Sequence, residues 1–187
     1  MILSLIGLPG VGKTKVSSEL ALQMGCSVLE LPGKKTKRLL FLRYCLKQPR
    51  NTYLLLWWTV KYNKGGLRVL KHKIFFLLLN SIAKEVLATK QVVDEGLLQY
   101  LCAISDKKLL ESEVLVILNS LKFKNRKVFI VTCDEAVRME RLEMRGRVPR
   151  SAFGVEYSDI FYKNLTHNFN LFYKLLSLKF ESEIIKN

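Results

Sequence analysis

The chain has 187 residues, of which 49% are hydrophobic, and its formal net charge is +15. This length is typical of one domain, and the apolar content can form a sizeable core, which excludes a disordered or low-complexity chain. The positive charge favours anionic ligands: phosphorylated molecules, nucleic acid or an acidic membrane.

The first predicted elements are a strand, a loop, a helix and a second strand. "ILSLI" (2–6) is a short apolar run that ends at a glycine, which is typical of a buried strand. A helix is predicted over 13–24, where apolar residues are interspersed with polar ones before a glycine. "SVLEL" (27–31) predicts a second strand, closed by Pro32 and Gly33.

The middle of the chain is predicted to be mostly helical. Residues 36–88 form helices that break at "QPRN" (48–51) and "NKGG" (63–66). "QVVDEG" (91–96) then predicts a third strand with an acidic end.

Helices and strands continue to alternate toward the C-terminus. The predicted elements are a helix over 97–121 with a break near Ser105 and Asp106, a strand over 127–133, a helix over 135–145, a loop over 145–154, a helix over 156–177 and a candidate fifth strand over 178–185. This alternation predicts an α/β fold with a mostly parallel sheet of about five strands. In such sheets ligands bind beyond the carboxyl ends of the strands, so the loops there should hold the chemistry.

"GLPGVGKT" (7–14) matches the phosphate-loop pattern G-x-x-x-x-G-K-[ST] between a predicted strand and a predicted helix. Its glycines permit positive φ, so that backbone N–H groups can turn toward a phosphate, and the helix adds its positive N-terminal end. We expect Lys13 to reach the β- and γ-phosphates of ATP and the Thr14 hydroxyl to bind Mg²⁺. The predicted nucleotide-binding residues of the loop are Gly7, Leu8, Pro9, Gly10, Val11, Gly12, Lys13 and Thr14.

This loop, its place near the start of the sequence and the chain length resemble the P-loop kinases of the nucleotide-kinase group, notably thymidylate kinase and the deoxynucleoside kinases. The resemblance implies a three-layer α/β/α P-loop NTPase fold in one domain over 1–187, with ATP and Mg²⁺ as cofactors. It also implies transfer of the γ-phosphoryl group to a small acceptor, beside a helical acceptor-side region over 34–90.

The acidic strand end "VVDEG" resembles the strand end beside the phosphate loop of P-loop kinases. The resemblance implies that Asp94 binds a Mg²⁺-bound water or takes a proton from the acceptor, although an ordinary acidic turn is the alternative. The thymidylate kinase group has Asp-Arg here, and the missing arginine argues against a nucleoside monophosphate as acceptor. Glu30 in "LELPG" resembles the general base of deoxynucleoside kinases, with a solvent-facing strand residue as the equal alternative.

The segment 134–150 resembles the arginine-rich lid of thymidylate kinase. Arg138, Arg141 and Arg145 are spaced by three and four residues, so they share one face of a helix. The resemblance implies that Arg141 and Arg145 fold over the phosphates, neutralise developing charge and exclude water. The alternative is a solvated helix in which neighbouring glutamates pair with the arginines.

The region from Lys34 to Lys90 holds 14 basic residues against a single acidic one, Glu85, which gives it a net charge of +13. This imbalance indicates an acceptor that is anionic, large or membrane-associated, whereas the alternative is a helical cap with solvated lysines. Its aromatic residues, taken singly, are expected to belong to the core. They are Tyr53, Trp57, Trp58, Tyr62, Phe75 and Phe76.

Two functions therefore compete. The first is an ATP-dependent kinase with Lys13, Asp94, Arg141, Arg145 and Glu30 in catalytic roles. The second is a P-loop ATPase that acts on nucleic acid or at an anionic membrane through 34–90. The sequence lacks the N-K-x-D motif of GTPases, and the identity of the acceptor and the oligomeric state stay open.

The four cysteines have no ligand spacing, which argues against zinc and favours buried, reduced thiols of a cytoplasmic protein. The N-terminus has no basic region before its apolar run, and no apolar run approaches the roughly 18 residues of a membrane span. We therefore expect a cytoplasmic location, with peripheral attachment to a membrane as the alternative.

Overall fold

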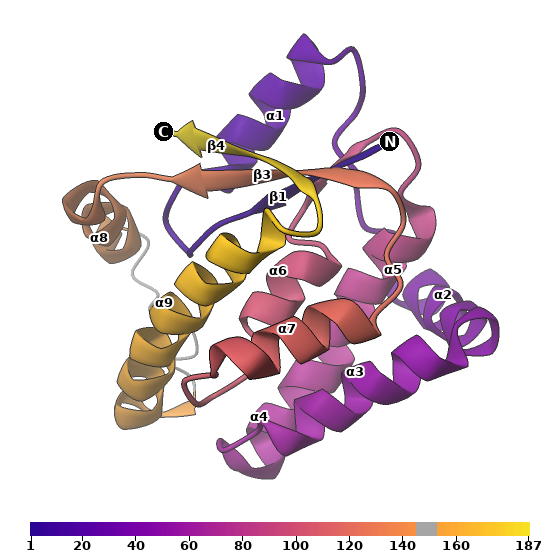
Figure 1. Cartoon of the computed structure of the whole chain (residues 1–187), viewed down its shortest axis with the longest axis vertical. Helices are drawn as coiled ribbons and strands as arrows, with labels where there is room; N and C mark the ends of the chain where they lie inside the picture. The colour runs from indigo at the N-terminus through magenta and orange to yellow at the C-terminus, as the bar shows by residue number, and fades with distance from the viewer. Residues whose placement is uncertain (145–152) are drawn as a thin grey trace.

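Parallel strands form the centre of the molecule (Figure 1). The computed structural model describes residues 1–144 and 153–187, and the strands within them run in the order β2-β1-β3-β4. Their bounds are β1 (Ile2–Ile6), β2 (Val92–Asp94), β3 (Arg126–Thr132) and β4 (Glu181–Lys186). Every pairing in this sheet is parallel, which confirms the predicted α/β fold.

The two inner strands, β1 and β3, are the most apolar. All five residues of β1 are buried, as expected for a strand covered on both faces. β4 forms one edge, where Lys127 pairs with Glu181 at 2.8 Å and with Glu183 at 3.1 Å. Charged side chains at an edge discourage pairing with another chain. The structure confirms the predicted fifth strand over 178–185, with observed bounds of Glu181–Lys186.

The predicted strand over 27–31 is wrong, and within the described residues the sheet has four strands rather than about five. This segment makes only an isolated bridge, between Val28 and Val92, with two backbone hydrogen bonds around it. Its partner β2 has three residues, and the side chain of Glu30 is exposed. No second pair follows this bridge, and Pro32, at the end of the segment, has no N–H to donate to a ladder.

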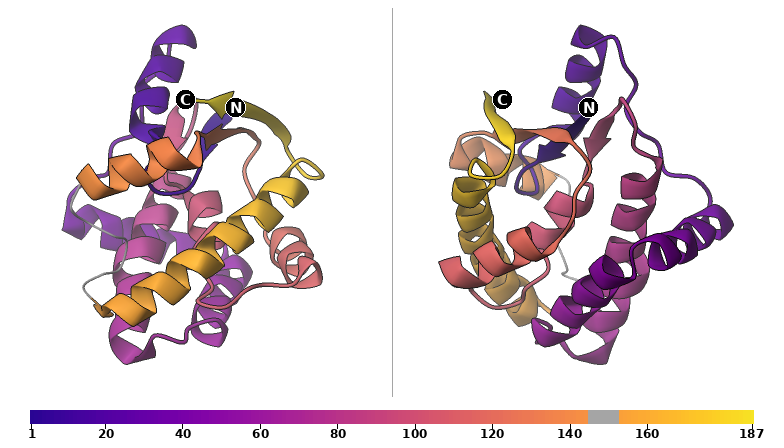
Figure 2. Two further views of the ribbon diagram at one scale, coloured as in Figure 1. Left: turned by 90° about the vertical axis from the view of Figure 1, so that its left-hand side faces the viewer. Right: turned by 45° about the vertical axis from the view of Figure 1, so that its right-hand side comes forward.

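Helices cover both faces of the sheet (Figures 1 and 2). α1 lies on one face, whereas α5, α6, α7 and α9 lie on the other, so the three-layer α/β/α architecture is confirmed. The helices are α1 (Lys13–Gln23), α2 (Lys34–Lys47), α3 (Pro49–Lys61), α4 (Gly66–His72), the π-helical turn η1 (Lys73–Leu78), α5 (Leu79–Leu87), α6 (Leu97–Cys102), α7 (Glu111–Ser120), α8 (Glu135–Met144) and α9 (Val155–Leu176).

The long helix α9 supplies much of the core beneath the sheet. Phe161, Leu165, Phe169, Phe172 and Leu176 recur at spacings of three and four, and each is less than 5% exposed. This spacing places them on one side of the helix, against the single large hydrophobic cluster.

The predicted helix breaks are confirmed. α2 ends and α3 begins around Gln48, and α3 and α4 are separated by residues 62–65. The predicted helix over 97–121 is divided into α6 and α7, with the break containing Ser105 and Asp106. The π turn between α4 and α5 was not predicted, and its first residue, Lys73, makes a tertiary contact.

That contact is an ion pair between Lys73 and Asp106, both buried. The Nζ atom of Lys73 lies 2.9 Å from Oδ1 of Asp106. The carboxylate also accepts hydrogen bonds from the backbone N–H of Lys64 (2.8 Å) and the hydroxyl of Tyr157 (2.7 Å). The pair therefore ties η1 to the loop before α4, the loop after α6 and α9.

Among the described helices, none combines the length and the apolar character needed to cross a bilayer. All four cysteines are free thiols, of which Cys102 is buried and the other three are half-buried. The expectation of buried cysteines is therefore confirmed for Cys102 alone.

Candidate active site

The phosphate loop joins β1 to α1 and packs tightly against the carboxyl end of β3. Gly10 and Gly12 have φ of 91° and 86°, a left-handed conformation that favours glycine. A Cβ atom at Gly7 would lie 2.7 Å from the carbonyl oxygen of Val131, and one at Gly10 would lie 2.9 Å from that of Arg138. The glycines are thus required by both backbone conformation and space.

Lys13 lies across this loop. Its side chain is 7% exposed, and its Nζ atom donates to the carbonyl oxygens of Gly7 (3.0 Å) and Leu8 (3.3 Å). The same ammonium lies 3.8 Å from the carboxylate of Glu95. Lys13 is the residue that the sequence analysis expects to bind the phosphates. Its ammonium therefore lies between the phosphate loop and the acidic end of β2.

Asp94 ends β2 beside the loop, because β2 pairs with β1 so that Asp94 is opposite Leu5. Its Oδ1 atom is buried and has no hydrogen-bond partner among the described residues. Burial raises the pKa of Asp94 above its ordinary value, while the charge of Lys13 and a hydrogen bond with Thr14 act in the opposite direction. An unsatisfied carboxylate oxygen next to a threonine hydroxyl is a donor set that suits a hard divalent cation.

Glu95 follows in a left-handed conformation, with φ of 53°, which is uncommon for a residue other than glycine. Such backbone strain is frequent at functional sites. Lys84 of α5 donates from its Nζ to the carbonyl oxygen of Asp94, and burial lowers the pKa of this lysine. Two ammonium groups and two carboxylates thus meet at the end of β2.

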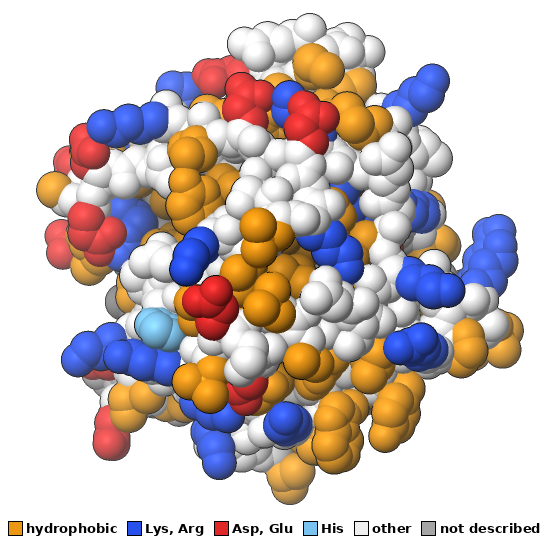
Figure 3. Space-filling model, viewed as in Figure 1, with side chains coloured by type: hydrophobic (Ala, Val, Ile, Leu, Met, Phe, Trp, Pro, Cys, Tyr) orange, Lys and Arg blue, Asp and Glu red, His pale blue; other side chains and the backbone are white. Residues whose placement is uncertain are grey.

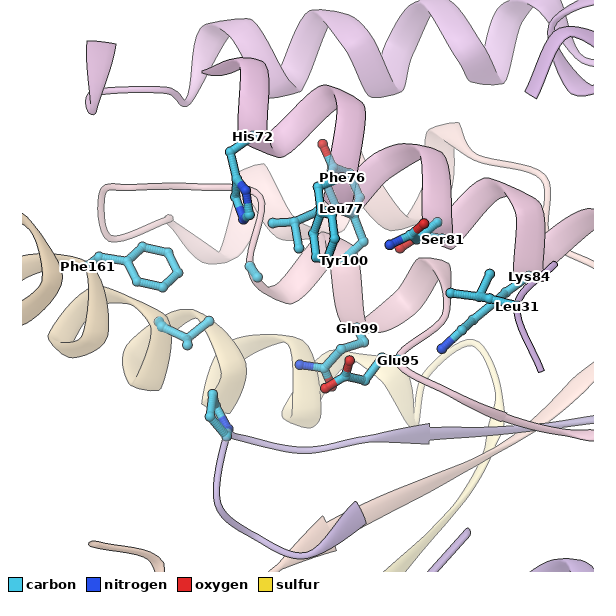
Figure 4. Close-up of a pocket in the computed structure, with 14 residues that line it drawn as sticks. Leu31, His72, Phe76, Leu77, Ser81, Lys84, Glu95, Gln99, Tyr100 and Phe161 are labelled. Atoms are coloured by element: carbon cyan, nitrogen blue, oxygen red, sulfur yellow. The ribbon is translucent and has the colours of Figure 1, made fainter. Parts of the chain in front are cut away.

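A cavity of about 450 Å³ opens beside these charges (Figure 4). Its walls come from the phosphate loop, α4, η1, α5, α6 and α9. In Figure 4, Glu95 and Gln99 lie together, while His72 and Phe161 lie toward one side and Ser81 and Lys84 toward the other. The lining residues are Pro9, Leu31, His72, Phe76, Leu77, Asn80, Ser81, Lys84, Glu95, Gln99, Tyr100, Ala103, Phe161 and Leu165.

Gln99 connects the cavity to the phosphate loop. Its Oε1 accepts a hydrogen bond of 2.8 Å from the N–H of Gly7. On the far wall the His72 ring stacks on Phe76, with their centroids 5.2 Å apart. Sequence reasoning missed both residues: Gln99 follows the acidic strand end by one helical turn, which is a weak signal, and His72 carries no local signal.

The arginines of α8 have separate places. Nη1 of Arg141 is buried, has no hydrogen-bond partner within residues 1–144 and 153–187, and lies 3.2 Å from where a Cβ atom of Gly12 would be. Arg138 is 3% exposed, pairs with Glu135 and lies 5.0 Å above the ring of Tyr162. Both arginines therefore lie beside the phosphate loop, Arg141 at Gly12 and Arg138 at Gly10, and Arg138 also packs α8 against α9.

Of the two other predicted site residues, Arg145 and Glu30, only Glu30 belongs to the described residues. Arg145 and the end of the predicted lid at 150 lie outside the described residues. Glu30 is exposed and does not line the cavity, although its neighbour Leu31 does, so its role stays a prediction. Asn187, which sequence reasoning missed, donates from its amide to the carbonyl oxygen of Val11 at 2.9 Å.

No protein-family model matches the chain, and no curated protein matches its sequence. Solved structures of deoxyadenosine kinase from M. mycoides do match it. The form with bound dATP has a TM-score of 0.54 and 17% identity over 100% of this chain and 91% of that chain. The form with the products dCMP and a flexible dCDP has a TM-score of 0.54 and 18% identity over 99% and 89% of the two chains.

A third form, with bound dCTP, has a TM-score of 0.51 and 16% identity over 100% of this chain and 90% of that chain. Identities this low establish the fold and nothing finer. The chain therefore has the fold of these nucleoside kinase structures, as the resemblance of its phosphate loop implied.

Proposed function

We propose that this chain is a P-loop kinase that transfers the γ-phosphoryl group of ATP to a hydroxyl of a small acceptor held in the cavity. The observation that carries this proposal is the 3.8 Å contact between Lys13 and Glu95. Lys13 belongs to the phosphate loop and Glu95 to the cavity wall, so a phosphate on the loop would face the cavity contents.

The residues present fit both ATP and a divalent cation. The loop from Gly7 to Thr14 would hold the phosphates, and Thr14 with the unsatisfied Oδ1 of Asp94 would hold Mg²⁺. When bound, Mg²⁺ would neutralise phosphate charge and orient the phosphates. Lys13 and Arg141, whose Nη1 has no partner, would supply the fixed positive charge that stabilises transfer.

Glu95 is the carboxylate best placed to accept the proton of the acceptor hydroxyl. It lines the cavity, whereas neither Asp94 nor Glu30 does. On this proposal the two acidic roles fall to neighbours: Asp94 would hold the metal and Glu95 would face the acceptor. Through its hydrogen bond with Gly7, Gln99 would hold the cavity wall in a fixed position relative to the phosphate loop.

A nucleoside is the acceptor class that we propose. The wall combines ring systems with two amides that can hydrogen-bond the edge of a base, which suits a flat heteroaromatic group. The rings belong to His72, Phe76, Tyr100 and Phe161, and the amides to Asn80 and Gln99. Among the described lining residues Lys84 alone carries an ammonium, which could pair with an anionic acceptor, so a sugar phosphate or an envelope glycan precursor is the acceptor class to compare.

Incubation with ATP labelled in its γ-phosphoryl group tests the proposal. Separate reactions would contain deoxynucleosides, ribonucleosides, nucleoside monophosphates, sugars and glycan precursors. We expect label in a nucleoside product, with little release as inorganic phosphate. Label that moves only to water, and faster when nucleic acid is added, would instead support the ATPase.

Substitution of Asp94 by asparagine tests the metal site through pH. Because burial raises the pKa of Asp94, protons should compete with Mg²⁺ at a higher pH than at an ordinary carboxylate. Affinity for MgATP should be complete above this pKa and be lost as the pH falls through it. Calorimetric titrations across acidic pH should show this loss in the wild type, whereas Asp94→Asn should bind weakly and without it. Equal pH profiles in the two proteins would remove Asp94 from the site.

Substitution of Arg141 by alanine tests the second cation. We expect kcat to fall about 10²- to 10³-fold with a smaller rise in KM for ATP, because the guanidinium should act on charge that develops in the transition state. Met139 is 41% exposed on the same helix, so Met139→Ala is the matched control and should retain the wild-type rate. A rise in KM at unchanged kcat would show that Arg141 only binds the nucleotide.

A further inference from the structure

Helices α2 and α3 expose a row of large apolar side chains that the proposed kinase site does not use. Leu39, Leu42 and Leu46 recur along α2, and Tyr53, Trp57 and Val60 recur along α3. All six are at least 52% exposed, and their spacings of three and four place each set on one side of its helix. We call these six residues the apolar row.

Basic residues accompany the apolar row: seven of those on α2 and α3 are exposed, whereas Lys37 is half-buried and donates to Asn80 at 2.9 Å. α2 and α3 together hold eight lysines and arginines and no aspartate or glutamate. Figure 3 shows orange and blue side chains side by side over these helices, at the lower right of the view. The eight are Lys34, Lys35, Lys37, Arg38, Arg43, Lys47, Arg50 and Lys61.

We propose that this face docks the protein on the surface of an anionic lipid bilayer. A helix that lies in the membrane interface buries an apolar side among the acyl chains and contacts headgroups with lysine and arginine. Tryptophan and tyrosine favour the same depth, which suits Trp57 and Tyr53. The positive charge complements anionic lipid and lacks the acidic residues that would oppose it.

Two other occupants fit less well. A second copy of the chain would bring eight more basic residues against the first eight, and this repulsion would have no acidic partner on α2 or α3 to offset it. Nucleic acid would satisfy the basic residues, but its interfaces are polar and wet and would leave Leu39, Leu42 and Leu46 without apolar contact.

Docking through this face would leave the candidate active site accessible. No residue of α2 or α3 is among those that line the cavity. α3 packs against η1 and α2 packs against α5, which carry the wall residues Phe76 and Lys84, whereas the apolar row lies on the exposed sides of α2 and α3. Variants on the row should therefore keep the basal activity.

Co-sedimentation with lipid vesicles tests the proposal. The wild type should bind vesicles of phosphatidylcholine and phosphatidylglycerol in about equal amounts and should not bind phosphatidylcholine alone. The double variant Leu42→Ser, Trp57→Ser should lose affinity at least about tenfold, because both side chains lose apolar burial. Arg43→Gln, Arg50→Gln should lose about thirtyfold, with a weaker dependence on salt.

The matched control is Val116→Ser, Leu178→Ser. Both residues are exposed, at 57% and 75%, and neither belongs to α2 or α3, so vesicle affinity should stay at the wild-type value. Circular dichroism would confirm that all three double variants fold.

Several results would overturn the proposal. They are equal binding to neutral and anionic vesicles, wild-type binding by Leu42→Ser, Trp57→Ser, or equal loss in the control. Binding of an oligonucleotide without binding of vesicles would assign the face to nucleic acid. A dimer seen by light scattering that Trp57→Ser dissociates would assign it to a second copy.

Discussion

Replacing Lys13 by alanine should abolish phosphoryl transfer, with kcat at least about a thousandfold below the wild type. The ammonium lies within 3.3 Å of two loop carbonyls and 3.8 Å from Glu95, so its removal takes away the charge between the phosphates and the acceptor cavity. The measurement is steady-state transfer of labelled phosphoryl to the nucleoside that the acceptor panel identifies.

Lys15→Ala is the matched control for this substitution. Lys15 lies on the same helix, but its side chain is 70% exposed and pairs with the exposed Glu19 at 3.9 Å. It should transfer phosphoryl at the wild-type rate. Wild-type turnover by Lys13→Ala, with the fold intact by circular dichroism, would refute the assignment of the loop to catalysis.

Replacing Asp106 by alanine should lower the free energy of unfolding by about 3–5 kcal/mol. The substitution leaves the buried ammonium of Lys73 without its carboxylate and removes the acceptor of the Lys64 N–H and the Tyr157 hydroxyl. Urea denaturation at neutral pH measures the loss. The exposed pair of Lys174 and Glu111, at 3.5 Å, gives the control, because Glu111→Ala should change stability by less than about 1 kcal/mol.

The same pair predicts a dependence on pH. Burial alone would raise the pKa of Asp106, but the Lys73 ammonium and the hydrogen bonds hold it below the ordinary value of 3.8. The stabilisation is therefore complete above that ordinary value and is lost as the pH falls below it toward the lower pKa of the folded state. The stability difference between the wild type and Asp106→Asn should shrink in this acidic range, and a difference that grows there would contradict the assignment.

Local patterns predicted the parts of the site that follow one another in the chain. The loop from Gly7 to Thr14 and the acidic end at Asp94 depend on a strand and the residues directly after it, and both lie where the pattern places them. The residues of the cavity wall, in contrast, are far apart in the sequence. His72, Lys84, Gln99 and Phe161 come from four separate helices, and only tertiary packing brings them together.

The same distinction explains the errors in the predicted fold. "SVLEL" has the composition of a strand, but a strand needs a ladder of pairs with its partner, and this segment makes only an isolated bridge to β2. Lys73, the first residue of the π turn, pairs with Asp106, which lies 33 positions later, and no local pattern predicts this contact. Strand pairing likewise depends on tertiary context as well as on local propensity.

Exposure could not be predicted for the aromatic residues of the basic segment. Trp58 and Tyr62 are buried, as expected, whereas Tyr53, Trp57, Phe75 and Phe76 are more than half exposed, so the prediction of core positions is wrong for these four. Trp57 and Trp58 are adjacent, so helix periodicity alone places them on different sides without saying which side meets the core. That choice depends on where α3 packs, and it is what gives the outer face of α2 and α3 its apolar row.

A crystal structure with Mg²⁺ and a non-hydrolysable ATP analogue tests most directly whether the phosphate loop and the cavity form one transfer site. The account predicts a γ-phosphate in contact with Lys13 and Arg141, with its free side open to the cavity at Glu95, and a cation between Thr14 and Asp94. A γ-phosphate separated from the cavity by protein side chains, or directed to solvent away from Glu95, would contradict the account.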